Sequence, residues 1–575
     1  MTNKNIISLS DKTLLKIYFR IDRIKEIYEH LDDLKKNIPS KEYEFSYGVY
    51  FIAIATLYRS LFKGLDKSIK LNIADFNATN EYINEIHNAL IRITDQDNAH
   101  LDKKSQSHYV VNIDSLKKGG STTIVTSLLS EDQLKKMMEF LEARFLPLIQ
   151  ANSLLLFPSA KSSIYLDHAS ATPLDPRVAT AMQPFLNELY GNPSSLHTAG
   201  QKAKEGVDRA RRTVAGILGA SAQEIIFTGG GTESNNLALL GIAEAYAHQG
   251  KHIITSAIEH ESVLEPLRYL EKERGFKVTF LPVDREGKVK LEALEQALTP
   301  QTILVSIMMA NNEVGTIQPI REIAKIIKNY ALKNASSSST VKAKSSPASG
   351  AASPLFHTDA CQAAGVLDLN VKEWGIDLLT LNGSKIYGPK GVGMLYVRNG
   401  VSFFPQIRGG GQERKRRAGT ENVPAIVGLA EALRLAQAEK ETENTRLTHL
   451  RERFIEGVQS LLKSLPASGA ASPPWLNGHP TDRLPNNIHF TIPGIEGETL
   501  LLRLDMEGVY ASAGSACTAG STDPSHVLLA MGISKRDAYG SVRFSLGRST
   551  TQQDVDRTVA IFARIVKELQ RESGV

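Results

Sequence analysis

A glycine-rich stretch of the sequence could bind a phosphate group. The apolar run Glu224–Thr228 predicts a strand, Gly229–Thr232 follows it, and an Ala- and Leu-rich segment typical of a helix comes next. Glycines between a strand and a helix let backbone N–H groups approach a phosphate, and the helix N-terminus adds partial positive charge. The stretch is neither a Walker A loop nor a dinucleotide fingerprint. An ordinary tight turn is therefore an equally good interpretation of these residues alone.

Two charged residues follow two further predicted strands. Asp359 ends the run that begins at Phe356, and Lys385 follows the run Leu378–Leu381. Taken singly, Asp359 is typical of a helix cap and Lys385 of a solvated charge. An aspartate for a pyridine nitrogen and a lysine amine for an aldehyde carbon are, however, what pyridoxal 5'-phosphate requires from a protein. Together with the glycine stretch, the pair indicates a pyridoxal phosphate site.

Alternating strands and helices are predicted around these residues. Short apolar runs separated by helical patterns favour a largely parallel sheet with covering helices, which is an α/β fold. The predicted strands include 224–228, 252–256, 278–282, 302–308, 378–381 and 393–397. Segments 334–354 and 464–474 interrupt this pattern and share the octapeptide PASGAASP. Because Ser, Ala, Gly and Pro bury little apolar surface, both segments are predicted to be flexible surface insertions.

The first 155 residues are built differently from the rest. They hold only four of the 42 glycines and neither cysteine. Apolar spacings of three and four predict helices over about 10–37, 46–62 and 77–93 and another after Ser130, with a hairpin between 109 and 128. We therefore expect a mostly helical domain of unknown function over 1–155, followed by a linker at 156–163.

The composition excludes several classes of protein. A chain of 575 residues is too long for one hydrophobic core, so several domains are expected. Its 67 basic and 62 acidic residues give a net charge of +5, which predicts neither a nucleic-acid surface nor a membrane surface. Two cysteines exclude a disulfide framework and favour a reducing compartment. Since the N-terminal residues lack an apolar signal core, we expect a cytoplasmic protein.

Residues 164 to about 570 resemble the cysteine desulfurases of iron-sulfur cluster assembly, in the class V aminotransferase group of fold type I pyridoxal phosphate enzymes. The resemblance implies a large cofactor-binding domain over 164–420 and a smaller α+β C-terminal domain over 421–575, to which 164–176 also contribute. It rests on ten segments in the family's order: YLDHASATPLDP, GNPSSLH, FTGGGTESNN, IEHESVLEP, NNEVGTIQPI, HTDACQ, NGSKIYGPKGVG, RGGGQERKRRAGT, GSACTAG and RFSLGR.

The resemblance implies cofactor-binding roles for the matched residues. Lys385 would hold the cofactor covalently and then move protons at the substrate's alpha carbon. Asp359 would keep the pyridine nitrogen protonated. His260 would lie over the ring and serve in proton transfer. The remaining implied contacts are Asn312 and Gln362 to the ring oxygen, and Gly231, Thr232, Asn382 and Ser384 to the phosphate, with Thr420 reaching the phosphate from the second subunit of a homodimer.

The implied reaction converts L-cysteine to L-alanine and leaves sulfane sulfur on the enzyme. Cys517 lies in a small, glycine-bearing loop that suits a thiolate which attacks the substrate sulfur and carries a persulfide. Arg543 would bind the substrate carboxylate with its planar pair of donors. Cys361 is interpreted as a packing residue. The sulfur acceptor would be an iron-sulfur scaffold or a tRNA thiolation factor, and no metal is implied.

Two other functions remain open at this stage. A selenocysteine lyase or another class V enzyme would share the fold, and relative turnover of cysteine and selenocysteine separates them. The family usually has a histidine directly before the lysine and a serine three residues before it, where this chain has Ser384 and Asn382. If this change weakens the enzyme, the protein would be chiefly a binding module whose N-terminal region recruits a partner.

Overall fold

The computed structural model describes residues 163–337, 353–463, 474–514 and 524–572. The chain divides into two compact units, Met1–Ser159 and Ala160–Val575, and all the described residues belong to the second. The elements predicted for 1–155, nearly all of the linker, most of the two insertions, and Cys517 lie outside the described residues.

The largest sheet of the described ranges has seven strands in the order β2-β8-β7-β6-β5-β3-β4. Neighbouring strands from β7 to β4 are parallel, whereas β8 runs antiparallel to both β7 and β2. The prediction of a mainly parallel sheet is therefore confirmed. Its strands are β2 Ile225–Thr228, β3 His252–Ser256, β4 Lys277–Leu281, β5 Thr302–Ser306, β6 Leu355–Asp359, β7 Leu378–Asn382 and β8 Gly393–Val397.

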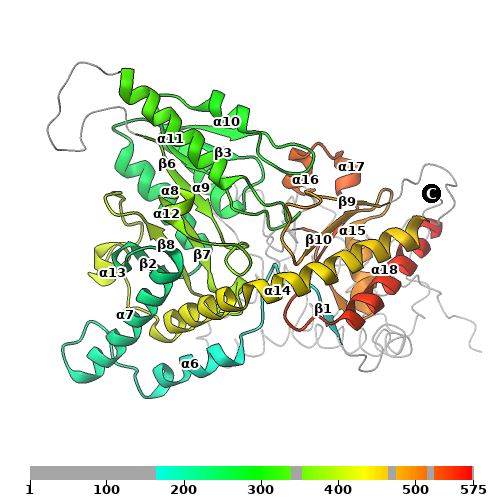
Figure 1. Ribbon diagram of the computed structural model, residues 1–575, viewed down its shortest axis with the longest axis horizontal. Helices are drawn as coiled ribbons and strands as arrows, with labels where there is room; N and C mark the ends of the chain where they lie inside the picture. The colour runs from blue at the N-terminus through cyan, green and yellow to red at the C-terminus, as the bar shows by residue number, and fades with distance from the viewer. Residues whose placement is uncertain (1–162, 338–352, 464–473, 515–523, 573–575) are drawn as a thin grey trace, which may run out of the picture. The chain divides into compact units, whose positions relative to one another are not determined.

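Helices cover both faces of this sheet (Figure 1). Side chains alternate between the faces of a strand, so neighbours such as Ile253 and Ile254 pack in two different apolar cores. Helices α8 and α9 contribute to one core, and α6, α7, α10, α11, α12 and part of α14 to the other. These helices are α6 Pro176–Asn187, α7 Thr198–Leu218, α8 Gly231–Tyr246, α9 Glu261–Arg274, α10 Leu291–Ala297, α11 Ile320–Ser337, α12 Val371–Trp374 and α14 Val423–Lys463. The short helices η2 Ala222–Glu224, η3 Gly383–Lys385 and α13 Gln412–Lys415 lie between the strands and helices of this part of the chain.

Helix α14 extends from the large sheet to a second, smaller core, as the yellow ribbon in Figure 1 shows. Its Leu429 packs in the first core, whereas its Phe454 packs in the second. An antiparallel sheet, β12-β10-β9, and a parallel pair, β1-β11, belong to this smaller part. None of the described helices is long and apolar enough to span a bilayer. The remaining elements are β1 Ile164–Tyr165, β9 Trp475–Leu476, β10 Asn487–Thr491, α15 Gly497–Met506, β11 Val509–Tyr510, α16 His526–Ala530, α17 Lys535–Ala538, β12 Ser541–Ser545 and α18 Gln552–Glu572.

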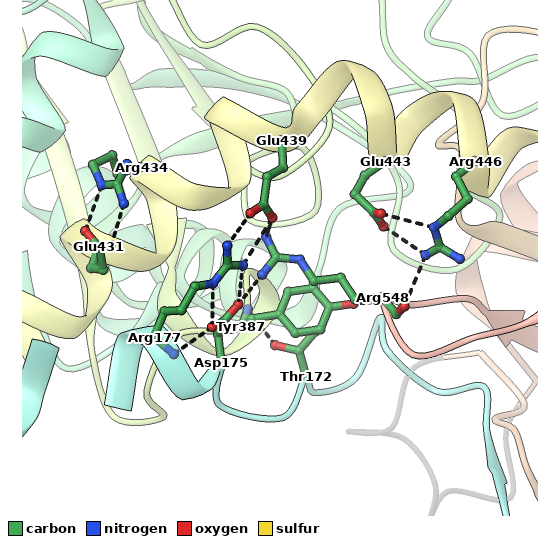
Figure 2. Close-up of polar contacts among 10 residues, drawn as sticks. All are labelled: Thr172, Asp175, Arg177, Tyr387, Glu431, Arg434, Glu439, Glu443, Arg446 and Arg548. Atoms are coloured by element: carbon green, nitrogen blue, oxygen red, sulfur yellow. Dashed lines mark hydrogen bonds and ion pairs between the residues drawn. The ribbon is translucent and has the colours of Figure 1, made fainter. Parts of the chain in front are cut away.

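A closed ring of four charged side chains fastens the segment before α6 to the C-terminal part of the chain (Figure 2). Arg548 contacts Asp175 at 2.5 Å and Glu439 of α14 at 2.9 Å. Arg177 contacts the same two carboxylates at 2.8 and 2.5 Å. Hydrogen bonding from Arg177, together with the charge of Arg548, lowers the pKa of Asp175 to about 2. Each charge in the ring therefore has two partners of opposite sign.

Tyr387 connects this ring to the turn that carries Lys385. Its φ of 62° lies in the left-handed region, which is unfavourable for an aromatic residue. Three hydrogen bonds hold it there: its N–H donates to Thr172 Oγ1 (2.8 Å), its carbonyl accepts from the Asp175 N–H (3.0 Å), and its hydroxyl accepts from the Arg548 N–H (2.8 Å). The Arg548 guanidinium also stacks over its ring at 4.5 Å.

The ring gives a first prediction about stability. Arg548→Ala should lower the free energy of unfolding by about 2 kcal/mol or more, because it leaves the buried Asp175 with one cation instead of two and removes the stack on Tyr387. Arg434→Ala is the matched control: it removes an exposed pair with Glu431 of the same helix and should cost less than about 0.5 kcal/mol. Urea unfolding followed by circular dichroism measures both, and equal losses would contradict the prediction.

Candidate active site

A cavity of about 180 Å³ brings together residues from both parts of the described chain. Lys385 and Asp359 come from the ends of neighbouring strands of the large sheet, and Arg543 comes from β12 of the smaller part. The predicted residues that line this cavity are Gly231, Thr232, His260, Asn312, Asp359, Gln362, Asn382, Lys385 and Arg543. The lining also contains Ala169, Ser170, Ser262, Met308, Ala310 and Cys361.

The amine of Lys385 is held by backbone carbonyls. Its Nζ donates to the carbonyl oxygen of Ala169 at 2.9 Å and to that of Ser170 at 2.5 Å. Both carbonyls belong to the segment between β1 and α6. Gln362 Nε2 donates to the same Ala169 oxygen at 2.9 Å. The position of the lysine amine therefore depends on the segment that the charged ring fastens.

Asp359 ends β6 with both carboxylate oxygens hydrogen-bonded. Oδ1 accepts from the backbone N–H of Cys361 at 2.9 Å, and Oδ2 accepts from Asn235 Nδ2 at 2.7 Å. The residue is only 8% exposed. A buried carboxylate that faces a cavity is suited to bind a cationic group such as a protonated pyridine nitrogen.

His260 is the N-cap of α9 and lines the same cavity. Its Nδ1 accepts from the backbone N–H of Ser262 at 3.0 Å and contacts the hydroxyl of that serine at 2.8 Å. Asn312 lies at the wall of the cavity, and its carbonyl accepts from Arg543 Nη1 at 2.9 Å. The predicted roles of these residues toward the ring stay predictions.

The glycine stretch lies at the N-terminus of α8, beside a second cavity of about 620 Å³. A Cβ at Gly231 would lie 2.9 Å from Cys361 Sγ and 3.4 Å from Asn382 Cβ, so a side chain there would crowd the wall between the two cavities. Asn382 Oδ1 accepts from the N–H of Ser384 at 3.3 Å and from its hydroxyl at 3.2 Å. Helix N–H groups, two short polar side chains and Arg417, which is paired with Glu233 of the same lining, thus surround a space that suits a phosphate.

Taken together, these residues fit pyridoxal phosphate. A lysine amine and a buried carboxylate line one cavity, and the N-terminal turn of α8, which begins with Gly231, lies where that cavity adjoins the next. Among the described residues, no group of three or more His, Cys, Asp or Glu could hold a metal ion.

Arg543 is almost fully buried, at 1% exposed. Its Nη2 donates to Asp167 Oδ1 at 2.8 Å and to Ser170 Oγ at 2.7 Å. A substrate carboxylate would therefore share this guanidinium with Asp167. The sequence did not indicate that pairing, although Asp167 stands within the quoted segment YLDHASATPLDP.

The remaining predicted residues are placed differently. Cys361 is not simply a packing residue, because its side chain lines the cavity beside Asp359. Burial and the Asp359 charge raise the pKa of its thiol well above the usual value. Thr420 is exposed and lines neither cavity of its own chain. Cys517 lies outside the described residues, so its role also stays a prediction.

Glu259 is a buried acid directly before His260. Its Oε1 accepts from Ser256 Oγ at 2.6 Å and from the Met308 N–H at 2.9 Å, whereas Oε2 has no partner among the described residues. Burial raises the pKa of Glu259 to about 8. In an unfolded chain a glutamate loses its proton near pH 4.3. Between these two values the folded protein keeps a proton that the unfolded chain has released.

This difference predicts how stability changes with pH. Stability falls as pH rises wherever the folded state binds the extra proton. Relative to Glu259→Gln, the parent should lose about 1 kcal/mol of unfolding free energy per pH unit between about pH 5 and pH 8. Urea unfolding across this range measures the difference. Glu265→Gln, at an exposed carboxylate of the following helix α9, should show no such slope, and a flat difference for Glu259→Gln would contradict the buried acid.

Comparison with known proteins supports the same chemistry. Residues 164–342 and 348–558 match the aminotransferase class-V family. The cysteine desulfurase IscS of Dictyoglomus turgidum is 47% identical over 410 residues, which are 71% of this chain and 96% of that relative. The cysteine desulfurase IscS of Methanosarcina thermophila is 47% identical over 411 residues, or 72% and 94% of the two chains.

Solved structures agree in fold. A NifS-like protein is 37% identical with a TM-score of 0.62, covering 71% of this chain and 100% of its own. A NifS-like protein from Rickettsia africae is 32% identical with a TM-score of 0.58, covering 70% and 99%. The predicted fold type I architecture is therefore confirmed. The chain belongs to the class V aminotransferase family and, within it, to the cysteine desulfurases.

Proposed function

We propose that this protein is a pyridoxal phosphate-dependent cysteine desulfurase that converts L-cysteine to L-alanine and carries the sulfur as a persulfide on Cys517. The observation that carries the proposal is the single cavity lined by Lys385, Asp359, His260 and Arg543. The relatives named above are cysteine desulfurases, so the selenocysteine lyase and binding-module alternatives are not favoured.

Different residues of the chain bind the cofactor, bind the substrate and transfer protons. Bound pyridoxal phosphate supplies a conjugated ring that stores the electrons left at the substrate's alpha carbon. Asp359 holds the ring nitrogen, the α8 N-terminus with Asn382 and Ser384 holds the phosphate, and Arg543 binds the substrate carboxylate. Lys385 removes the alpha proton and returns protons to the carbon skeleton.

Sulfur transfer follows from the chemistry of a thiolate. Cys517 Sγ attacks the substrate sulfur, so an S–S bond forms while the bond between that sulfur and the beta carbon breaks. The electron pair of the broken bond goes to the carbon skeleton, which gains a proton and leaves as alanine. The sulfur then passes to an acceptor, for which an iron-sulfur scaffold or a tRNA thiolation factor is proposed. A reducing compartment keeps a catalytic thiol free of disulfides, so a cytoplasmic location is part of the proposal.

The cysteine assignment has a direct test. Given L-cysteine and a reducing thiol, the parent should release alanine and sulfide, and Cys517→Ala should lose at least about 100-fold of both rates, because the nucleophile is gone. Cys361→Ala is the matched variant for the chain's other thiol, and mass spectrometry should still find a persulfide on the peptide with residue 517. Sulfide release by Cys517→Ala at the parent's rate would refute the assignment.

Lys385→Ala should no longer retain the cofactor after borohydride reduction.

A homodimer is part of the proposal because several exposed residues suit a second copy of the chain. Leu196 is 93% exposed and Tyr190 is 77% exposed. Both residues lie in the connection between α6 and α7. A second copy of the chain could shield these two apolar side chains from water. Thr420 is also exposed and lines neither cavity of its own chain, which fits its proposed contact with the phosphate of the partner subunit.

Leu196→Asp should therefore shift the protein from dimer toward monomer in light scattering after size exclusion, since a charge would have to be buried in the interface. The shifted fraction should also lose cofactor, because each site needs Thr420 of the partner. Leu332→Asp, a matched change at a residue of α11 that is 57% exposed, should leave the mass unchanged. A Leu196→Asp protein with the parent's mass and cofactor content would contradict this interface.

A further inference from the structure

A chain of buried hydrogen bonds joins Asp359 to His260. Asn235 Nδ2 donates to Asp359 Oδ2 at 2.7 Å and to Ser262 Oγ at 2.9 Å. Ser262 Oγ in turn contacts His260 Nδ1 at 2.8 Å. Asn235 comes from α8, Ser262 from α9 and Asp359 from β6, so this series of hydrogen bonds connects three elements. Asn235 is fully buried, and Ser262 is 8% exposed.

The chemistry of the partners fixes the direction of every bond. A carboxylate accepts and does not donate, so the amide nitrogen of Asn235 must face Asp359. The second hydrogen of that nitrogen points to Ser262 Oγ. Because the backbone N–H of Ser262 donates to His260 Nδ1, that nitrogen is an acceptor, and the serine hydroxyl gives its own hydrogen to it. The carbonyl oxygen of Asn235 is left without a partner among the described residues. A buried amide with an unsatisfied oxygen is costly, which indicates that its two donated bonds are what retains it.

His260 is held in one tautomer by the same contacts. The backbone N–H of Ser262 also donates to His260 Nδ1, at 3.0 Å. Because Nδ1 accepts from this N–H and from the hydroxyl, it carries a lone pair, and the ring hydrogen of the neutral imidazole is on Nε2. Both residues proposed to meet the cofactor ring, Asp359 and His260, are thus oriented through one amide.

We propose that Asn235 is a positioning residue of the desulfurase, which fixes the Asp359 carboxylate directly and the His260 imidazole through Ser262. The proposal rests on the proposed function, because the two oriented residues matter only if the cavity holds the cofactor ring. Asn235 itself lines neither cavity, so it acts through the residues that it holds.

A matched control for Asn235 exists in the smaller part of the chain. Asn477 is 3% exposed, and its Nδ2 contacts His489 Nδ1 at 2.9 Å and donates to Thr491 Oγ1 at 2.7 Å. It is therefore another buried amide that joins a histidine to a hydroxyl, and it lines neither cavity. Asn235→Ala and Asn477→Ala should lower the melting temperature by similar amounts.

Measurements on the cofactor-loaded forms of both variants distinguish a positioning role of Asn235 from a purely structural one. Asn235→Ala should lower kcat at least about 10-fold with KM changed less, because a bond to a charged group is lost. It should also change the visible circular dichroism of the bound cofactor, which reports the asymmetric surroundings of the ring. Asn477→Ala should leave both readouts at the parent's values. If the two variants match in kcat and in visible circular dichroism, the positioning role is wrong.

A second pair of variants keeps the proposal testable if Asn235→Ala does not fold. In holoenzyme labelled with nitrogen-15 in histidine, the parent's His260 signals, assigned by their loss in His260→Gln, should show a bare Nδ1 and a protonated Nε2. Ser262→Ala should move the Nδ1 signal, whereas Ser262→Thr, which keeps the hydroxyl, should restore it. A protonated Nδ1 in the parent would overturn the proposal. A parent that makes no alanine from cysteine would instead refute the proposed function.

Discussion

The guanidinium of Arg548 joins three parts of the chain that are distant in sequence, since it bonds Asp175 and Glu439 and stacks on Tyr387. The Asp175 carboxylate of this ring is shielded from water, with only 7% of its side chain exposed, and a buried charge is tolerated only when it is paired. The ring therefore accepts few alternative arrangements. Tyr387 keeps its left-handed backbone because hydrogen bonds from this ring and from Thr172 over-determine it. Since Tyr387 is two residues after Lys385, the same contacts limit where the lysine amine can lie.

Arg543 depends on the ring in a similar way. It precedes Arg548 by five residues, and its strand pairs with β10 of the smaller core. Its guanidinium bonds Asp167 and Ser170 of the segment between β1 and α6, and the Asn312 carbonyl of the large part. Ser170 also supplies a carbonyl to Lys385. The amine and the guanidinium are thus set by one short segment, which explains how a cavity formed by two cores can keep a defined geometry.

The sequence predicted more of the fold than of the contacts within the site. Apolar runs and helical spacings give the strands of the large sheet, and residues at strand ends identify Asp359 and Lys385. Asn235 stood inside a quoted motif, yet nothing in its neighbours shows that it meets Asp359. The two residues are 124 positions apart, and only the pairing of β2, β8, β7 and β6 brings α8 to the end of β6. For the same reason Asp167 as partner of Arg543 could not be inferred from spacing.

Burial favours the neutral form of three titratable groups near the cavity, Glu259, His357 and Cys361. It lowers the pKa of His357 to about 4 and raises that of Glu259 to about 8, so neither carries a full charge near neutral pH. The same cause, with the Asp359 charge, raises the pKa of the Cys361 thiol. A protonated thiol is a poor nucleophile, so Cys361 is unsuited to attack the substrate sulfur although it lines the cavity. The chain has only one other cysteine, and this agrees with the proposal that Cys517 carries the sulfur.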